Sequence, residues 1–136
     1  VSKAGIFRVP VIGWNMRMNG YIPLVRGDRD SVKEMMATCE RTLEQGSSLM
    51  MFPEGTRSMT GALQPFKTGA FELAVKAQVP IVPIVIQGTH DALPKHGFVL
   101  RGRHNISVTV LPAFVPDGSV EQMTARARTL IAEALD

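Results

Sequence analysis

The sequence predicts an α/β protein, in which a layered sheet of mixed, partly parallel strands is flanked by helices. Stretches with apolar residues at helical spacing alternate with short apolar runs typical of strands. With 136 residues, 45% of them hydrophobic, the chain is long enough to form a packed core. No internal repeat, linker or low-complexity segment is visible. We therefore expect a single domain over residues 1–136.

Four elements are predicted in the first half of the chain. They are a short helix over 9–18, a short strand over 21–25, a longer helix over 31–46 and a buried strand over 49–52. Pro10 is tolerated in the first turn of the first helix, and Gly20 ends it. The run at 49–52 is continuously apolar, as expected for a strand covered on both faces of its sheet.

The helix over 31–46 is the most clearly patterned element of this half. Ser31 and Glu34 have the spacing of a capping box, and Gly46 closes the helix. One apolar face is predicted at steps of three and four, comprising Val32, Met35, Met36, Cys39 and Leu43. Cys39 is the only cysteine, so the chain cannot form an internal disulfide. Its place on this face predicts a buried apolar filler rather than a nucleophile.

The second half opens with a loop of about fifteen residues. Then follow a helix over 69–76, a strand over 79–87, a glycine-rich basic loop over 90–104, a strand over 106–110 and a C-terminal helix. The helix over 69–76 should turn Phe71, Leu73 and Ala74 inward. Two prolines in 79–87 predict a sheet edge or kinked ends. Ser119 and Gln122 are predicted to cap the last helix, whose apolar side comprises Val120, Met123, Ala127, Leu130, Ile131 and Ala134.

Composition narrows the classes of function. The net charge of +3 and the pI of about 9.4 favour anionic partners such as phosphates or acidic lipids. Basic residues are not interleaved with aromatic ones, so we expect no nucleic-acid partner. No metal-ligand cluster or nucleotide-binding glycine loop appears, and we expect no cofactor. No apolar run approaches the roughly 20 residues that a membrane-spanning helix needs.

Two stretches, Gly20–Arg26 and Phe52–Ser58, each deliver an arginine after an apolar run. Ligands of open α/β sheets collect beyond the carboxyl ends of strands, and a guanidinium matches two phosphate oxygens. Arg26 and Arg57 therefore suggest a phosphate pocket, to which Lys67 adds a third positive charge.

Neighbouring residues suit the same pocket. Gly55 allows close approach to the backbone, and Thr56 and Ser58 offer hydroxyl groups. Simpler interpretations stay open, because Arg26 or Lys67 alone is compatible with an ordinary solvated charge. Glu54 and Arg57 have the spacing of a pair across a turn.

These residues resemble four ordered blocks of the glycerolipid acyltransferase family, whose best-known members are the 1-acyl-glycerol-3-phosphate acyltransferases. FPEGTRS at 52–58 matches the most specific block letter for letter, and GYIPLVR at 20–26 resembles the block before it. PFKTGAFELA at 65–74 and VPIVPI at 79–84 resemble the two blocks that follow. FRVPVIGW at 7–14 is similar to the stretch that precedes the arginine block. The resemblance is strong over about the first 90 residues and looser beyond them.

The resemblance implies roles for individual residues. Arg26 and Arg57, with Lys67 as a weaker candidate, would bind the phosphate of the acceptor. Glu54, Gly55, Thr56 and Ser58 would shape the acceptor pocket. The VPIVPI strand would either wall the acyl-donor site or support the core.

The family's catalytic motif is His-x-x-x-x-Asp, upstream of the arginine block. His90, His96 and His104 do not complete it and are expected to be surface loop residues. No catalytic residue is therefore assigned in this chain. We expect the histidine and aspartate upstream of Val1, in an N-terminally incomplete acyltransferase domain that is inactive alone.

The implied function is phospholipid biosynthesis, with acyl-CoA or acyl-carrier protein as donor and lysophosphatidate as acceptor. Two alternatives stay open: another acceptor (a different lysolipid, glycerol 3-phosphate or a lipid amine), or a non-catalytic phosphate- or lipid-binding module.

The implied location is the cytoplasmic face of a membrane, peripheral or anchored through the missing N-terminal part. We expect weak, salt-dependent binding to an anionic membrane surface. Met35, Met36, Phe98 and the basic 95–104 loop are candidates for bilayer contact, although ordinary core and solvated-loop roles explain them equally well.

Overall fold

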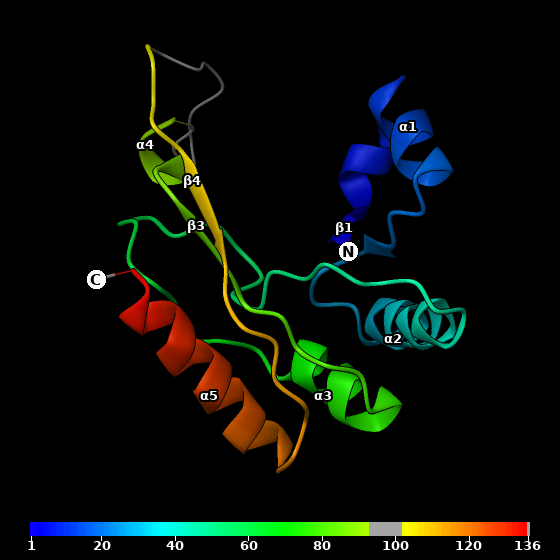
Figure 1. Cartoon of the computed structure of the whole chain (residues 1–136). Helices are drawn as coiled ribbons and strands as arrows, with labels where there is room; N and C mark the ends of the chain where they lie inside the picture. Colours follow the sequence, from blue (N-terminus) through cyan, green and yellow to red (C-terminus); the bar gives the residue numbers. More distant parts are fainter. Residues whose placement is uncertain (93–101, 136) are drawn as a thin grey trace. The chain divides into compact units, whose positions relative to one another are not determined.

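A computed structural model describes residues 1–92 and 102–135 (Figure 1). The chain divides into two compact units, Val1–Met51 and Phe52–Asp136, and each is described by itself. Helices occur in both units, together with one parallel and one antiparallel pair of strands. The predicted mixture of strand pairings is therefore confirmed. Most of the predicted 90–104 loop, including Lys95, His96 and Phe98, lies outside the described residues.

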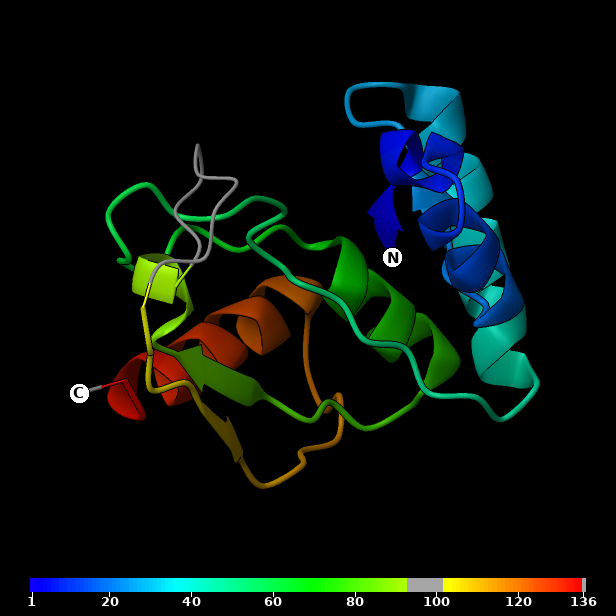
Figure 2. The same cartoon turned by 90° about the horizontal axis from the view of Figure 1, so that it is seen from above.

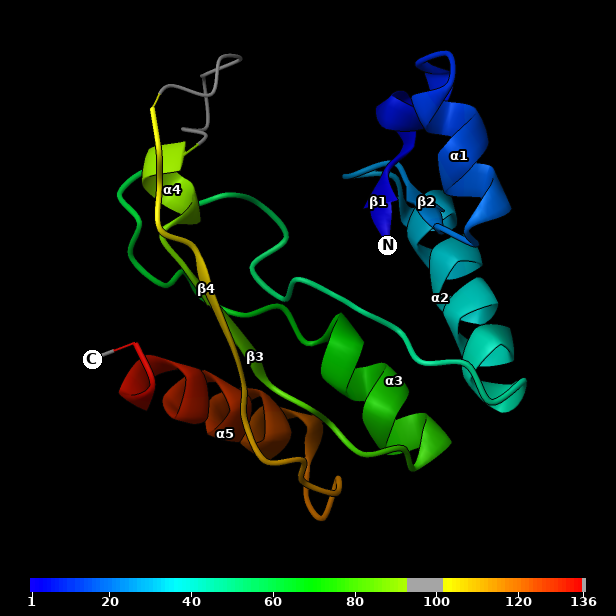
Figure 3. The same ribbon diagram turned by 45° about the horizontal axis from the view of Figure 1, so that its top comes forward.

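The first unit contains two short strands, a 3₁₀ helix and two α-helices. In order they are β1 Ser2–Lys3, η1 Ala4–Arg8, α1 Ile12–Met18, β2 Pro23–Leu24 and α2 Arg29–Glu44. β1 and β2 pair in parallel, with Ser2 opposite Pro23 (Figure 3). The strand predicted over 21–25 is therefore real but shorter. Buried apolar residues come from every part of the unit and comprise Phe7, Met16, Ile22, Met35 and Cys39.

Helix α1 begins three residues later than the predicted start at Val9. The N–H of Ile12 donates to the carbonyl of Pro10 at 2.7 Å, and Val11 between them has φ 66° and ψ −54°. This is a γ-turn of the rare positive-φ type, and an α-helix of L-residues does not continue through it. The predicted end is confirmed, because Gly20 follows the helix with φ 66° and donates its N–H to the carbonyl of Arg17.

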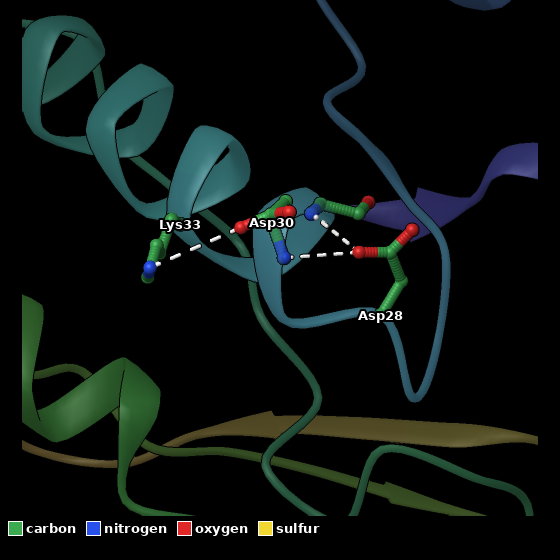
Figure 4. Close-up of polar contacts among 4 residues, drawn as sticks. Asp28, Asp30 and Lys33 are labelled. Carbon is green, nitrogen blue, oxygen red and sulfur yellow. Dashed lines mark hydrogen bonds and ion pairs between the residues drawn. The ribbon is translucent and has the colours of Figure 1, made fainter.

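Helix α2 is capped by Asp28, so the capping box predicted at Ser31 and Glu34 is wrong. One carboxylate oxygen of Asp28 accepts the N–H groups of Asp30 at 2.9 Å and Ser31 at 3.1 Å (Figure 4). The Ser31 hydroxyl instead accepts the N–H of Val25 at 2.9 Å. Asp28 is the N-cap because it directly precedes Arg29, the first helical residue. At this position its carboxylate also interacts favourably with the helix dipole.

The predicted inward face of α2 is confirmed at Met35 and Cys39, which are buried. The assignment of Val32 to this buried face is wrong, since 40% of the surface of Val32 is exposed. The Cys39 thiol shows the expected filler role, lying 3.6 Å from the sulfur of Met35, and burial raises the pKa of this thiol. Because Met35 is buried, it cannot be the bilayer contact that was one of its two sequence interpretations.

The second unit contains three helices and two strands in its described part. They are α3 Gly69–Ala77, β3 Ile84–Gln87, α4 Thr89–Ala92, β4 Ser107–Val110 and α5 Val120–Glu133. β3 and β4 are antiparallel, with Ile84 opposite Val110 and Gln87 opposite Ser107. Helices α3 and α5 lie side by side (Figure 2). The core formed there comprises Phe71, Phe114, Met123 and Ala127.

Two predicted strands need correction. No strand forms over 49–52 in the described structure, because a four-residue apolar run without a partner ladder and followed by a proline does not make a strand. The strand predicted over 79–87 is restricted to β3, with an isolated bridge between Ile81 and Phe114 before it. Pro80 and Pro83 have no N–H to donate, so the ladder is interrupted as the prediction of kinked ends implied.

The predicted cap of α5 and the predicted inward face of α3 are confirmed. In α5 the Ser119 hydroxyl accepts the N–H of Gln122 at 3.3 Å, and the Gln122 side chain accepts the N–H of Ser119 at 2.8 Å. This is a complete capping box. Phe71, Leu73 and Ala74 of α3 are buried as predicted.

Candidate functional site

Residues 53–67 of the second unit, which we call the 53–67 loop, form a closed loop. The N–H of Lys67 donates to the carbonyl of Pro53 at 2.9 Å and so joins its two ends. At its start the N–H of Gly55 donates to the carbonyl of Phe52 at 3.0 Å. Compact loops with adjacent ends are frequently functional. The sequence blocks FPEGTRS and PFKTG are thus held side by side.

Glu54 holds the inside of the loop together. It is half-buried, and its carboxylate accepts the N–H of Gln64 at 2.8 Å. The side-chain amide of Gln64 in turn donates to the Ser58 hydroxyl at 3.4 Å and to the Ala62 carbonyl at 3.0 Å. A hydrogen bond to an ionised acceptor is stronger than a neutral one. Glu54 therefore organises the loop across ten residues of sequence.

The two hydroxyl residues of the motif have different surroundings. The oxygen of the half-buried Ser58 hydroxyl also accepts the N–H of Thr60 at 3.2 Å, which makes a local turn. Ser58 thus takes part in the folding of the loop. Thr56, by contrast, is exposed beside Arg57.

Lys67 lies over the glycine of the motif. A β-carbon placed on Gly55 would lie 3.1 Å from Cε and 3.2 Å from Nζ of Lys67. The preceding residue, Phe66, is anchored because its ring stacks on that of Phe71, with centroids 6.4 Å apart and planes at 12°. Lys67 itself is exposed. The stacked ring of Phe66 thus anchors the end of the 53–67 loop to the core. The ammonium group of Lys67 lies over the turn at Gly55.

Replacing Gly55 by alanine is expected to lower the free energy of unfolding by about 1–2 kcal/mol, because Gly55 has φ 69°. In the full-length protein it should also lower the rate of the reaction that this site serves, since the new methyl group displaces the end of Lys67. Gly46→Ala is the matched control, with φ 78° and nothing within 4 Å of an added β-carbon. Denaturation should give similar losses for both variants, whereas only Gly55→Ala should change the rate. Equal rates for the two variants would contradict this role of the Gly55–Lys67 contact.

The two arginines lie in different units. Arg57 is exposed on the 53–67 loop. Arg26 is exposed in the first unit, two residues beyond β2, and is followed by Gly27 with φ 84°. The structure thus brings Lys67 together with Gly55 and joins Glu54 to Ser58 through Gln64. Arg26 belongs to the first unit, which is described by itself.

Two residues of the site were not found from the sequence. Gln64 links Glu54 to Ser58, and no local pattern indicates this because the contact depends on closure of the loop. His90 of α4 is half-buried, and a β-carbon on Gly61 would lie 3.6 Å from its ring. The expectation that His90 is a surface loop residue is therefore wrong. His104 is exposed as expected.

The described residues form neither a cluster of potential metal ligands nor a membrane-spanning helix. Over 1–92 and 102–135, no group of three or more histidine, cysteine, aspartate or glutamate residues is placed to hold a metal ion. No helix in these ranges combines the length and apolar character needed to cross a bilayer.

Comparison with known proteins relates this chain to one family. A family model described as Acyltransferase matches residues 1–87. A chloroplastic 1-acyl-sn-glycerol-3-phosphate acyltransferase of Brassica napus is 38% identical over 136 residues, covering 100% of this chain and 39% of the relative. The enzyme of that name from Saccharomyces cerevisiae is 38% identical over 105 residues, covering 74% of this chain and 35% of the relative.

A solved structure is similar over almost the whole chain. The crystal structure of the 1-acyl-sn-glycerophosphate (LPA) acyltransferase PlsC from Thermotoga maritima matches with a TM-score of 0.76 at 25% identity. The match covers 98% of this chain and 53% of that structure, which supports the α/β fold. The chain spans only about 39% of the length of the Brassica napus relative. The family match covers both FPEGTRS and PFKTG, and the chain belongs to the acyltransferase family.

Proposed function

We propose that the protein carrying this chain moves a fatty acyl group from acyl-CoA or acyl-carrier protein to the free hydroxyl of lysophosphatidate. The relatives that support this are named 1-acyl-sn-glycerol-3-phosphate acyltransferases. The observation that carries the proposal is the 53–67 loop, in which Lys67 crosses the FPEGTRS turn at Gly55. The product would enter phospholipid synthesis.

The proposed role of the cationic residues is to bind the acceptor phosphate. Arg57 and Arg26 would each offer a planar fork of donors to two phosphate oxygens, and Lys67 would add a point charge. Gly55 would let the phosphate approach the backbone closely. Glu54 would act indirectly, because Gln64 links it to Ser58, the residue that follows Arg57.

The proposed chemistry is attack of the acceptor hydroxyl oxygen on the thioester carbonyl. A carbon–oxygen bond forms, the carbon–sulfur bond breaks, and the thiol leaves with the proton that the hydroxyl gave up. A base is needed because a neutral alcohol is a weak nucleophile at pH 7. We propose that this base is a histidine held by an aspartate outside the present chain. The residues of this chain would bind and orient the acceptor.

The proposed setting is a membrane surface, peripheral or anchored, facing the cytoplasm or, as in the relatives named chloroplastic, the interior of a plastid. This setting follows from the substrate, since lysophosphatidate and its product are lipids. Electrostatic attraction to acidic lipids is consistent with the net charge of +3.

The test is thiol release from acyl-CoA and from acyl-carrier protein by the full-length protein, with and without lysophosphatidate. Release that depends on lysophosphatidate supports the proposal. A panel with glycerol 3-phosphate and other lysophospholipids decides the acceptor, and preference for one of these would replace lysophosphatidate in the proposal. If no acceptor stimulates release, the proposal fails and a non-catalytic lipid-binding module takes its place.

A further inference from the structure

An exposed apolar surface covers the beginning of the first unit. We call it the η1–α1 face, and its residues are Val9, Val11, Trp14, Met18 and Tyr21. The most exposed of them are Val11 at 76%, Met18 at 70% and Trp14 at 66%. All belong to residues 9–21, the stretch that follows η1 and contains α1, which is labelled in Figure 1. Large apolar side chains gathered in this way usually mark an interaction surface.

The geometry of α1 separates this face from the core. Trp14 and Met18 are four residues apart and therefore lie one above the other on the helix. The buried residues of α1, Gly13 and Met16, lie on the other side. A β-carbon on Gly13 would lie only 2.1 Å from the carbonyl oxygen of Phe7, so this side is packed tightly against η1. The Trp14–Met18 side is held outward as a result.

The charged residues of the segment that carries the face are all of one sign. Residues 1–27 contain Lys3, Arg8, Arg17 and Arg26, and the first acidic residue of the chain is Asp28. All four basic side chains are exposed. An apolar surface with basic neighbours and interfacial aromatics suits the boundary between acidic head groups and acyl chains. A protein partner would be expected to meet such a face with acidic groups, whereas an anionic lipid surface supplies them at every head group.

Backbone strain supports the same role by an independent observation. Val11 is β-branched and adopts φ 66° in the γ-turn, a conformation that costs energy. The turn does not bury the side chain, since Val11 is the most exposed large apolar residue reported for the described chain. Strain of this kind is retained where the conformation serves a function. Here it presents Val11 next to the start of the Trp14–Met18 helix.

We propose that the η1–α1 face docks on an anionic lipid bilayer. Val11 and Met18 enter the acyl region, Trp14 and Tyr21 lie at the level of the head groups, and Arg8 and Arg17 contact lipid phosphates. The inference deepens the proposed function, on which it rests for the lipid nature of the substrate. The proposed membrane contact is thus made by α1 and the residues that flank it, and not by Met35 of α2.

Trp14 provides the measurement, because it is the only tryptophan of the 136-residue chain. The chain is mixed with vesicles of neutral lipid, or of neutral lipid with anionic lipid, either unlabelled or brominated in the acyl chain. We expect Trp14 emission to shift to the blue and to be quenched by the brominated lipid only when anionic lipid is present. Raising the salt to 1 M should reverse both changes, since the screening length falls to about 3 Å.

Variants separate this face from the rest of the surface. R8Q/R17Q should weaken vesicle binding about 25-fold, at about five-fold for each cation. The matched control K76Q/R128Q, which removes two exposed cationic side chains of the second unit outside the 95–104 loop, should bind as the unchanged chain does. M18S should also bind less well than V115S, since Val115 is 63% exposed but lies in the second unit. V11G removes the strained side chain, so it should weaken binding without lowering the free energy of unfolding.

Four results would overturn the proposal. They are absence of quenching in low salt, equal binding of R8Q/R17Q and the unchanged chain, a larger loss for K76Q/R128Q than for R8Q/R17Q, and Trp14 already shielded from acrylamide without vesicles. The last would mean that protein, such as a second copy of the chain, covers the face. The experiment contains neither acyl donor nor acceptor. Loss of the proposed acyl transfer and loss of lipid docking are therefore observed separately.

Discussion

Replacing Arg57 with alanine in the full-length protein is expected to lower kcat/KM for lysophosphatidate about 10- to 150-fold. The reason is that a hydrogen bond to a charged group contributes roughly 1.5–3 kcal/mol. If the arginine binds the phosphate equally in the ground and transition states, the change appears mainly in KM for the acceptor. KM for acyl-CoA should change little. Initial rates at varied acceptor and donor concentrations measure both.

Two further variants define what the loss at Arg57 means. Arg57→Lys keeps the charge but loses the planar fork, so its kcat/KM should lie between those of the unchanged protein and Arg57→Ala. Arg128→Ala removes an exposed arginine of α5 and should leave the rates unchanged. If Arg57→Ala keeps its kcat/KM but unfolds more easily, Arg57 serves the stability of the 53–67 loop and its assignment to the phosphate is wrong.

Replacing Gly13 with alanine is expected to lower the free energy of unfolding by about 1–3 kcal/mol, the range seen for overpacked cores. The added β-carbon would lie 2.1 Å from the oxygen and 2.6 Å from the carbon of the Phe7 carbonyl. These are backbone atoms, so no flexible side chain can move aside. Either α1 separates from η1 or the turn at Val11 changes. Denaturant titration followed by circular dichroism measures the loss.

Gly5→Ala is the matched control for Gly13→Ala. Gly5 lies in η1, and nothing lies within 4 Å of an added β-carbon there. Its effect on the free energy of unfolding should stay within about 0.5 kcal/mol. If the two variants are equally stable, the packing of α1 on η1 is looser than the structure indicates, and the outward display of Trp14 loses its support.

The helices show how far local sequence signals reach. The capping box at Ser119 was correctly predicted because both of its hydrogen bonds join residues three apart, so nothing distant has to be known. The box at Ser31 was wrong for an equally local reason. Asp28, three residues earlier, accepts the N–H groups of Asp30 and Ser31, so the helix begins before Ser31 and the Ser31 hydroxyl accepts the N–H of Val25 instead.

The strands depend on partners far along the chain, and their predictions were less accurate. β3 pairs with β4, whose residues lie twenty or more positions further along the chain, and proline limits the length of β3. The apolar run at 49–52 has a strand-like composition but no partner ladder in the described structure. A strand is defined by the hydrogen bonds of its neighbour, which its own residues do not specify.

The sequence by itself determined the α/β class, the existence of helices α1, α2, α3 and α5, the burial of Cys39 and, through FPEGTRS and PFKTG, membership of the acyltransferase family. Each of these properties depends on the periodicity of apolar residues or on a motif of contiguous residues. Only the tertiary structure decided that Glu54 bonds to Gln64, that Lys67 crosses Gly55, and that Trp14 and Met18 face outward. These facts arise when a loop closes or a helix packs. The free energy of loop closure and helix packing depends on contacts between residues that are distant in sequence, so a local sequence pattern cannot predict it.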